Sequence, residues 1–403
     1  MKIKIHKGKA RGSVAVPPSK SIAHRLLIAA AMAKGESVVR RVPDCEDVLA
    51  TLDCLSALGV KTERYGEDIK VYGIDFTTAV TSSPLPCRES GSTMRFMIPL
   101  ALLSSNPATL VGKGGLLARP MTPYEDIAKK CGLTFLKGSD GYTVCGPLSA
   151  GEYTLPGDIS SQFITGLIFA LAALPEDSKI RITKKLESRS YVELTRAALA
   201  TFGVRVLWED ESTVFIPGGQ QFIPCDVTVE GDFSGAAFLF ALNHIGGEVK
   251  PLLLNPESLQ GDRVCEELLK RLHREGEEID ITDCPDLGPI LFASAAALSG
   301  ATFTGTRRLK IKESDRVSAM AEELSKLGVT VTVSENSVTV GGGALSEPKE
   351  ELCGHNDHRI VMSLAVLLTL TGGIISGAEA VNKSYPDFFT HLEALGIRCE
   401  RID

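Results

Sequence analysis

Apolar and polar positions along the chain predict two kinds of helix that alternate with one another. Six segments combine a polar or glycine-containing start with an almost wholly apolar body, which is typical of helices buried on every side. They begin SKSIAHRLLIAAA, SGSTMRFMIPLALL, SSQFITGLIFALAAL, FSGAAFLFALNHIGG, LGPILFASAAALSG and DHRIVMSLAVLLTL. In the first of them the apolar body runs from Ile22 to Ala33, directly after Lys20 and Ser21.

An amphipathic type of helix lies between the buried ones, and each of its six members ends at a glycine. These glycines are Gly59, Gly132, Gly203, Gly276, Gly328 and Gly396. A glycine at this place is typical of the left-handed residue that closes a helix. Four of the six are followed by two short alternating runs with a turn between them, which predict β-hairpins. The hairpin is least clear in the fourth repeat, where the chain reads EEIDITDCPD.

The repeated pattern predicts six βαβαββ-like units, each with one buried and one amphipathic helix. The expected fold class is therefore α/β (α+β). Three such units per domain make two domains with pseudo-threefold symmetry, and the first three units end near Asp226.

Composition narrows the class of protein. The chain has 403 residues, of which 44% are hydrophobic and 23% charged, so a folded protein of two domains is expected rather than a disordered or fibrous one. A net charge of −7 argues against a nucleic-acid surface. The first residues have charge but no apolar segment of signal-peptide length, and we expect a cytoplasmic protein that does not bind membranes. The apolar segment from Ile360 is broken by Gly372 and Gly373, which favours a buried helix over a membrane span.

The ten cysteines contain no CxxC pair, and free thiols in a reducing compartment are the expected state. Cys353, His355 and His358 lie close together in sequence and could be imagined as metal ligands. Their spacing matches no common zinc site, so we expect no metal.

Polar and cationic residues gather where the buried helices begin. A helix start carries unpaired N–H groups and about half a positive charge, so several starts aimed at one place make an anion site. Ser21 and Arg25 are four residues apart, which places them on one helix face; the same spacing holds for Gly91 with Arg95 and for Lys312 with Arg316. A single Ser or Asp at a helix start can simply be a cap. A cation there opposes the helix dipole, so Lys20, Arg25, Arg119, Arg316 and Arg359 together predict a bound anion.

Eight segments spread over the whole chain carry a family resemblance. They are PPSKSIAHR, ESGSTMR, ARPM, GDISSQF, PDLGP, KIKESDR, NDHR and NKSYPDFF. In this order they closely resemble the 5-enolpyruvylshikimate-3-phosphate synthase family of enolpyruvyl transferases. The resemblance implies a two-domain inside-out α/β barrel with residues 14–226 in one domain, residues 1–13 and 227–403 in the other, and the active site in the cleft between them.

The resemblance also implies a reaction. The enolpyruvyl group of phosphoenolpyruvate moves to the 5-hydroxyl of shikimate 3-phosphate by addition and elimination, with release of phosphate. This step belongs to the shikimate pathway, which leads to chorismate and the aromatic amino acids. No metal and no organic cofactor takes part, the partners are the two small-molecule substrates, and a monomer is expected.

Site residues carry over from the family motifs as expectations. Shikimate 3-phosphate is expected to contact Lys20, Ser21, Arg25, Ser160, Ser161, Gln162, Ser188, Asp286 and Lys312. Phosphoenolpyruvate is expected to contact Lys20, Gly91, Arg119, Gln162, Arg316, Arg359 and Lys383. The expected catalytic residues are Asp286 as the base for the 5-hydroxyl, Glu313 as the acid and base at C3, and Lys20 between the substrates.

Several of these residues keep a structural alternative. Asp286, Ser160 and Ser161 could cap helices, and Asp315 is expected to serve its own turn. His24 and His358 are expected to position neighbouring site residues rather than react.

Two positions depart from the family pattern, because Glu89 and Arg308 stand where many relatives have Asn. Gly91 is retained, so glyphosate, a mimic of phosphoenolpyruvate, has room in principle. Glu313 lies between Lys312 and Arg316, whose charges oppose its acting as an acid, and we expect it to gain proton affinity when anionic substrates bind.

Two other functions remain alternatives. UDP-N-acetylglucosamine enolpyruvyl transferase has the same architecture, but that family usually carries a cysteine in the stretch that here reads GKGGLLARP, and this stretch has none. A non-catalytic scaffold or a nucleic-acid-binding protein on a similar fold is opposed by the net charge and by the pair Asp286 and Glu313.

Overall fold

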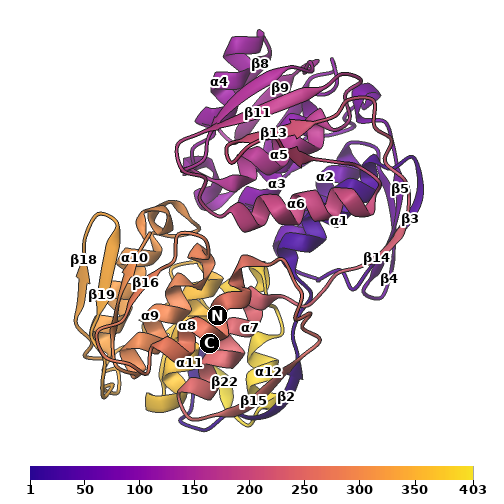
Figure 1. Cartoon of the computed structure of the whole chain (residues 1–403). Helices are drawn as coiled ribbons and strands as arrows, with labels where there is room; N and C mark the ends of the chain where they lie inside the picture. The colour runs from indigo at the N-terminus through magenta and orange to yellow at the C-terminus, as the bar shows by residue number, and fades with distance from the viewer. Residues whose placement is uncertain (403) are drawn as a thin grey trace. The chain divides into compact units, whose positions relative to one another are not determined.

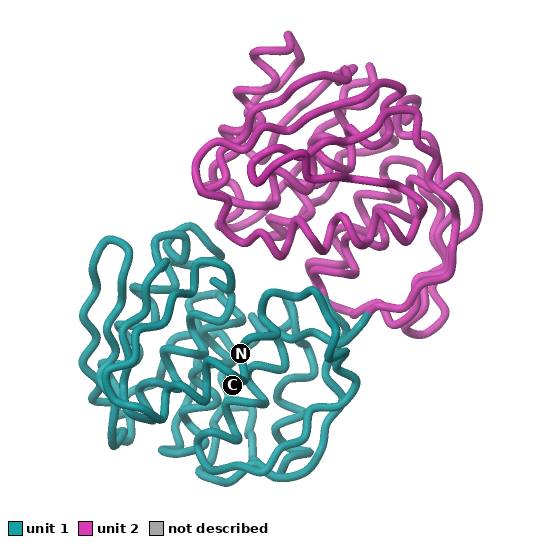
Figure 2. Tube along the Cα trace, viewed as in Figure 1, with its two compact units in different colours: residues 1–19, 230–403 teal, residues 20–229 magenta. Residues whose placement is uncertain are grey.

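The computed structural model describes residues 1–402 and divides the chain into two compact units. Unit 1 comprises Met1–Ser19 and Glu230–Asp403, and unit 2 comprises Lys20–Val229 (Figure 2). The chain thus leaves unit 1 after Ser19 and returns to it at Glu230, so unit 1 is built from two separate stretches of sequence.

Unit 2 is built around three helices that are apolar almost all the way round. They are α1 (Lys20–Met32), α3 (Gly91–Ala101) and α5 (Ser161–Leu171). Their bodies are almost entirely buried, and Figure 1 shows α3 and α5 beneath a layer of strands. This burial explains the pattern in the sequence, because a helix with protein on every side has no face for charged residues.

Three four-stranded sheets surround these helices, with the strand orders β14-β3-β5-β4, β6-β7-β9-β8 and β10-β11-β13-β12. The strands are β3 (Gly35–Arg40), β4 (Lys61–Tyr65), β5 (Asp68–Gly73), β6 (Leu85–Pro86), β7 (Ala108–Val111), β8 (Thr134–Lys137), β9 (Gly141–Cys145), β10 (Glu152–Pro156), β11 (Ser178–Thr183), β12 (Leu207–Trp208), β13 (Thr213–Ile216) and β14 (Asp226–Thr228). In each sheet the first two strands are parallel and the remaining pairs antiparallel, so the same unit is repeated. The amphipathic helices α2 (Glu46–Ala57), α4 (Thr122–Cys131) and α6 (Arg189–Thr201) complete the repeats.

Unit 1 repeats this plan around α7 (Phe233–His244), α9 (Gly288–Ala297) and α11 (His358–Thr371). Its amphipathic helices are α8 (Cys265–Arg271), α10 (Arg316–Lys326) and α12 (Phe388–Ala394). Two sheets have the orders β16-β17-β19-β18 and β20-β21-β1-β22, formed by β1 (Lys2–Ile5), β16 (Glu278–Asp280), β17 (Ala301–Thr304), β18 (Val331–Val333), β19 (Ser337–Val340), β20 (Leu352–Cys353), β21 (Gly373–Ser376) and β22 (Cys399–Ile402).

The fourth repeat is the irregular one. Its strand β15 (Glu248–Leu252) pairs only with β2 (Arg11–Ala15), in parallel, as a two-stranded sheet. The N-terminal strand β1 instead lies between β21 and β22 and is antiparallel to both. Residues at the start of the sequence therefore complete two sheets of unit 1.

The local predictions for helices and hairpins are confirmed. The helix-closing glycines have φ values of 93°, 68°, 78°, 72°, 82° and 89° at positions 59, 132, 203, 276, 328 and 396. Hairpins follow four of the amphipathic helices, as the alternating runs predict: β4-β5, β8-β9, β12-β13 and β18-β19.

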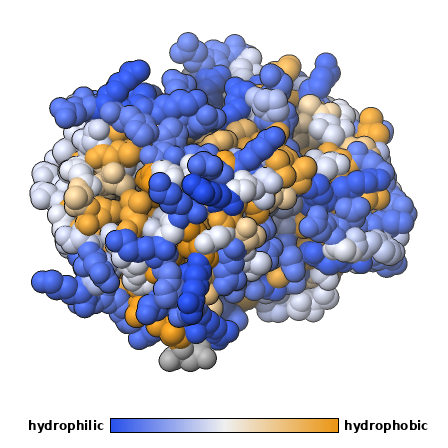
Figure 3. All heavy atoms as spheres, turned by 90° about the horizontal axis from the view of Figure 1, so that it is seen from below, coloured by the Kyte–Doolittle hydropathy of each residue, from blue (hydrophilic) through white to orange (hydrophobic). Residues whose placement is uncertain are grey.

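The cysteines and the apolar helices also follow expectation. All ten cysteines lie among the described residues and are free. None of the helices within residues 1–402 is long and apolar enough to cross a membrane. Hydrophilic residues cover most of the face drawn in Figure 3, with smaller apolar areas between them.

Candidate active-site residues in the two units

The first helix of unit 2 begins with a nearly buried ion pair. Lys20 is the first residue of α1, and its Nζ lies 2.8 Å from Oδ2 of Asp47 near the start of α2, with 13% and 11% of the two side chains exposed. An ammonium so placed has little water around it. This pairing keeps a cation at the helix start, where the helix dipole alone would oppose it.

Arg25 lies one turn further along α1 and is 2% exposed. Its guanidinium donates to neutral oxygens only: to Thr195 Oγ1 at 2.9 Å, to the Ser21 carbonyl at 2.6 Å and to the Tyr191 carbonyl at 3.0 Å. It also lies over the rings of Phe96 and Tyr191, 5.4 and 5.7 Å from their centroids. Burial lowers the pKa of Arg25 to about 10. Among the described residues no carboxylate forms an ion pair with it, so the positive charge is available to an anion.

The side chain of Gln162, on α5, contacts two residues of α3. Its Oε1 accepts from Arg95 Nη1 at 2.7 Å, and its Nε2 donates to Ser92 Oγ at 2.8 Å. Ser160 caps α5 by accepting from the backbone N of Gln162 at 3.3 Å, and the buried Ser161 begins the helix. The cap proposed for Ser160 is therefore confirmed, while α3 supplies the partners that orient Gln162.

Gly91 and Arg119 lie in contact. A Cβ added at Gly91, the first residue of α3, would lie 2.6 Å from Arg119 Nη1. Arg119 follows the short 3₁₀ helix η2 (Gly114–Ala118) and does not stand at the start of a helix, contrary to the reading of its sequence. Glu89, the departure from the family pattern, lies against the same segment, because a Cβ at Gly114 would meet its Oε1 at 2.8 Å.

Ser188 precedes α6 and is buried, with a left-handed φ of 59° that is uncommon for serine. Its side chain does not cap the helix. Residues held in such sparsely populated conformations cluster at functional sites.

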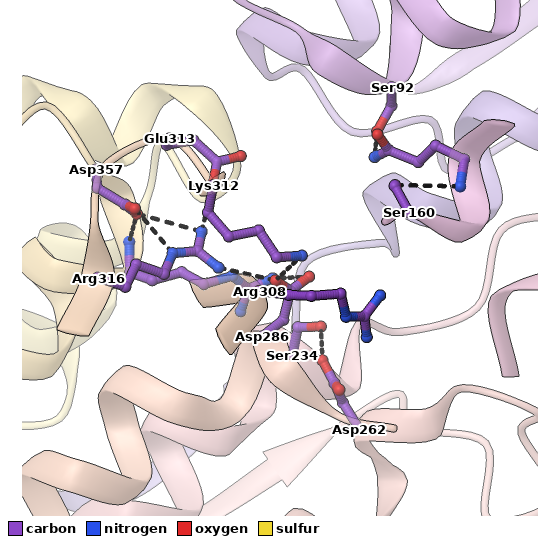
Figure 4. Close-up of polar contacts among 12 residues, drawn as sticks. Ser92, Ser160, Ser234, Asp262, Asp286, Arg308, Lys312, Glu313, Arg316 and Asp357 are labelled. Atoms are coloured by element: carbon purple, nitrogen blue, oxygen red, sulfur yellow. Dashed lines mark hydrogen bonds and ion pairs between the residues drawn. The ribbon is translucent and has the colours of Figure 1, made fainter. Parts of the chain in front are cut away.

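In unit 1, Asp286 lies among three cations. Its Oδ1 is 2.8 Å from Arg316 Nη1 and 3.3 Å from Lys312 Nζ (Figure 4), and its Oδ2 is 3.3 Å from Arg359 Nη2. Burial by itself would raise the pKa of Asp286, but the charges of Arg359, Lys312 and Arg316 outweigh it and hold this pKa well below its usual range. The alternative that Asp286 caps α9 is wrong, since α9 has no side-chain cap.

Arg316 is the centre of this cluster and is 1% exposed. Besides Asp286 it contacts Glu313 Oε2 at 2.6 Å through Nη2 and Asp357 Oδ2 at 2.8 Å through Nε. Burial lowers the pKa of Arg316, but Asp357, Glu313 and Asp286 raise it further than burial lowers it. The adjacent cation expected for Glu313 is therefore present as a direct ion pair.

The segment KIKESDR does not form the single helix that its four-residue spacing predicts. Lys312 and Arg316 do not share a helix face, because Lys312 ends the 3₁₀ helix η5 (Arg307–Ile311) and Arg316 begins α10. The residues between them form a turn that Asp315 stabilises by accepting from the backbone N of Val317 and Ser318. The two cations meet through Asp286 instead.

Arg359 and Lys383 each contact the segment that precedes α11. Arg359 is 5% exposed, and its backbone N donates to Asp357 Oδ1 at 2.9 Å. Lys383 ends the 3₁₀ helix η6 (Ala378–Lys383) and donates to the Asn356 carbonyl at 2.7 Å. The structure thus brings Asp286, Lys312, Glu313, Arg316 and Arg359 together, with Lys383 bound to the same segment.

Two residues with large roles were not singled out from the sequence. Asp357 is fully buried, caps α11 and pairs with Arg316, and the NDHR segment already offered an acid directly before a buried helix. Asp262 is 2% exposed and accepts from Ser234 Oγ (Figure 4). Burial and the charge of Asp286 raise the pKa of Asp262 to about 6. No sequence pattern marked it, because its neighbours come from distant segments.

His24 is buried and lies at one end of a chain of hydroxyl groups that links three helices. Its Nδ1 lies 2.7 Å from Thr51 Oγ1, which continues through Thr93 Oγ1 at 2.8 Å to Ser90. Burial, and then the charges of Lys20 and Arg25, hold the pKa of His24 well below its usual range. A neutral ring therefore joins α1, α2 and α3 behind the two cations.

These observations define an α/β protein made of repeated βαβαββ units, with buried cations in each compact unit that suit a small polyanionic ligand. Residues 5–392 match the family EPSP synthase (3-phosphoshikimate 1-carboxyvinyltransferase), and the chain belongs to this family. The family, the fold class and the transferase class expected from the motifs are confirmed.

Known proteins agree with the family match. Proteins named 3-phosphoshikimate 1-carboxyvinyltransferase from Clostridium kluyveri and Clostridium botulinum are 39% and 37% identical to this chain; each comparison covers 98% of this chain and 97% of the relative. A solved structure of EPSP synthase from Acinetobacter baumannii shares the fold with a TM-score of 0.80, at 24% identity and over 99% of this chain and 100% of that one.

Proposed function

We propose that this chain transfers the enolpyruvyl group of phosphoenolpyruvate to the 5-hydroxyl of shikimate 3-phosphate and releases phosphate. The observation that carries the proposal is the buried cluster in which Arg316 joins Asp286, Glu313 and Asp357, in a member of this family. Addition and elimination need acids and bases beside a cationic cradle, and this cluster combines both.

For shikimate 3-phosphate, the proposal rests most strongly on Arg25. Its buried guanidinium is satisfied by neutral oxygens and rings, so a phosphate or carboxylate would gain a charge-assisted contact of roughly 1.5–3 kcal/mol. The other proposed ligands are Lys20, Ser21, Ser160, Ser161, Gln162, Ser188, Asp286 and Lys312. The carboxylate of Asp286 would accept from the 5-hydroxyl.

For phosphoenolpyruvate, the proposed ligands are Lys20, Gly91, Arg119, Gln162, Arg316, Arg359 and Lys383. These residues come from both units. A site that uses all of them would have to lie in a cleft between the two domains, and this placement is a prediction. Arg359 and Arg316 would exchange part of their contact with carboxylates for contact with the substrate.

That exchange bears on catalysis by Asp286. In the free protein Arg359, Lys312 and Arg316 hold the pKa of Asp286 well below its usual range, which makes it a weak base. Anionic substrates that neutralise these cations would raise its affinity for a proton. Glu313, paired to Arg316, would gain proton affinity in the same way and serve as the acid and base at C3. Substrate binding would therefore activate both carboxylates.

We further propose that the chain works as a cytoplasmic monomer without metal, organic cofactor, nucleic acid or membrane. A size measurement in solution that gave a dimer would contradict the first part. Loss of activity on treatment with a chelator would contradict the second.

Phosphate release tests the reaction. Release should require both phosphoenolpyruvate and shikimate 3-phosphate; release with UDP-N-acetylglucosamine as the acceptor would instead establish the rival activity. Among variants, Lys20→Met should lose substrate binding and Glu313→Ala mainly turnover. Equal effects of the two variants on binding and turnover would contradict the assigned roles.

A further inference from the structure

The segment Cys353–Asp357 runs from the last residue of β20 to the residue that caps α11, and it contacts Arg316, Arg359 and Lys383. Its last residue, Asp357, binds Arg316 and the backbone N of Arg359. The carbonyl of Asn356 accepts from Lys383. The conformation of this segment, called here the 353–357 turn, therefore sets the position of three cations proposed to bind phosphoenolpyruvate.

The backbone of the 353–357 turn is strained. His355 and Asn356 have φ values of 47° and 51°, in the left-handed region. That region is disfavoured for a residue with a side chain, because the Cβ comes too close to the backbone, although Asn tolerates it better than most. Two such residues in succession persist only where surrounding contacts hold them.

Glu323, on α10, supplies two of these contacts, beside the backbone hydrogen bond from Asp357 N to the Gly354 carbonyl at 2.9 Å that closes the turn. Its carboxylate is fully buried, and its Oε2 accepts from the backbone N of Cys353 at 2.9 Å. Its Oε1 lies 2.9 Å from His355 Nε2, which must donate because an ionised carboxylate only accepts. One side chain thus holds the residue at the start of the turn and the first strained residue within it.

A metal ion is not needed to explain this arrangement. Glu322, Glu323 and His355 do place ligand atoms within 4.8 Å of one another. The ammonium of Lys326, however, lies 3.0 Å from Glu323 Oε1 and 3.7 Å from Glu322 Oε1, where it neutralises the carboxylates. The buried charge of Glu323 is thereby satisfied by Lys326, His355 and a backbone N–H.

We propose that Glu323 is a positioning residue for phosphoenolpyruvate binding, which acts by holding the 353–357 turn in its strained conformation. Arg316, Arg359 and Lys383 all depend on this turn for a contact, whereas most of the ligands proposed for shikimate 3-phosphate lie in unit 2. Loss of the Glu323 contacts should therefore weaken the binding of phosphoenolpyruvate and leave the binding of shikimate 3-phosphate unchanged. This inference rests on the proposed function.

The test compares Glu323→Gln with Glu322→Gln in the full chain. The amide introduced by Glu323→Gln has no charge and one acceptor oxygen, so it can keep the Cys353 N–H, but it loses the ion pair with Lys326 and can bind the His355 ring only as a donor to Nε2. We expect the KM for phosphoenolpyruvate to rise about tenfold, as for loss of a hydrogen bond to a charged group, with the KM for shikimate 3-phosphate unchanged. Glu322 has 59% of its side chain exposed and pairs with Lys326 rather than with the turn backbone, so its variant should match the wild type.

Two outcomes would overturn the proposal. One is a Glu323→Gln variant with the same KM for phosphoenolpyruvate as the Glu322→Gln control. The other is an equal rise in both KM values, or a lowered melting temperature alone, which would mean that Glu323 only stabilises the fold. An inactive wild type would instead contradict the proposed function, so the two failures are distinguishable.

If Glu323→Gln does not fold, His355→Asn tests the role of the Glu323 contact in phosphoenolpyruvate binding. Asn tolerates the left-handed conformation but is too short to reach Glu323, so this change removes the ring contact with little new strain. The same selective rise in the KM for phosphoenolpyruvate, smaller than for Glu323→Gln, is expected. An unchanged KM in this variant would contradict the role of the contact.

Discussion

Two buried arginines, one in each compact unit, are held in opposite ways. Arg25 is 2% exposed and has neutral oxygens and aromatic rings around its guanidinium, so burial lowers its pKa to about 10. Arg316 is 1% exposed and touches three carboxylates, which raise its pKa. The guanidinium of Arg25 therefore has no carboxylate partner within residues 1–402, whereas the guanidinium of Arg316 has three.

This difference separates two uses of a buried cation. A guanidinium surrounded by neutral partners retains most of its attraction for an incoming anion. One that is already paired contributes to folding and holds the carboxylates around it in place. Arg25 is thus suited to bind a ligand, and Arg316 to organise catalytic acids and bases as well as to bind.

The largest effect is expected from Arg316→Met. Removing this cation leaves Asp357 buried without its main partner, and breaking a buried pair in this way costs about 3–5 kcal/mol of unfolding free energy. Turnover should fall by more than the roughly 10- to 100-fold expected for one charge-assisted hydrogen bond, since Asp286 and Glu313 also lose their positions. Urea denaturation and phosphate release measure the two effects.

The stability lost in Arg316→Met should depend on pH, which tests whether the unpaired Asp357 causes the loss. In the wild type burial by itself would raise the pKa of Asp357, but the charge and hydrogen bond of Arg316 together with the charge of His358 outweigh it and lower this pKa. Asp357 therefore stabilises the fold above its unfolded pKa of about 3.9, and this stabilisation is lost as pH falls. In the variant, burial raises that pKa, so the stability difference should narrow as pH falls from about 7 toward 4. A difference independent of pH would contradict the assignment.

Arg25→Met should change substrate binding much more than it changes the stability of the fold. Its removal leaves no carboxylate unpaired, and Thr165 and Thr195 still bond each other at 2.8 Å, so the unfolding free energy should change by no more than about 1.5 kcal/mol. The KM for shikimate 3-phosphate should rise roughly 10- to 100-fold. Arg25→Lys, which keeps the charge without the planar fork, should recover part of the affinity. A large loss of stability with unchanged KM would remove the contrast with Arg316.

Lys312→Met tests how the cations around Asp286 set its basicity. Lys312 is one of three cations that lower the pKa of Asp286, so this pKa should rise in the variant. Asp286 acts as a base only when ionised, and the fall of kcat/KM at acid pH should therefore move to higher pH. Lys310→Met is the matched control, because Lys310 is exposed and contacts the Glu335 carbonyl instead. If kcat/KM falls at the same acid pH in the variant as in the wild type, the ionisation of Asp286 does not control this fall.

Gly91→Ala is expected to have the smallest effect. The added Cβ would lie 2.6 Å from Arg119 Nη1, but the end of a flexible side chain can shift. We expect a rise of a few-fold in the KM for phosphoenolpyruvate, no change for shikimate 3-phosphate and weaker inhibition by glyphosate. Inhibition of the wild type by glyphosate that is unaffected by phosphoenolpyruvate concentration would refute a shared pocket.

Much of the fold could be predicted because its signals are local. The apolar bodies of α1 and α11 follow from burial on every side, and Gly328 ends α10 because it adopts a φ of 82°. The misplacement of Lys312 and Arg316 on one helix face had a local cause as well. A spacing of four residues suits a helix, but Asp315 between them is a cap, and a cap means that the helix has not yet begun.

The sequence by itself determined the six repeats, the helix ends and the residue types at the site, because each of these depends on neighbours a few positions away. Only the tertiary structure decided that Arg316 meets Asp286 and Asp357, which are 30 and 41 residues distant, and that Arg25 meets neutral oxygens instead of a carboxylate within residues 1–402. The physical reason is that the charge state of a buried group depends on what surrounds it in space. Those surroundings are assembled from segments that only the packed fold brings together.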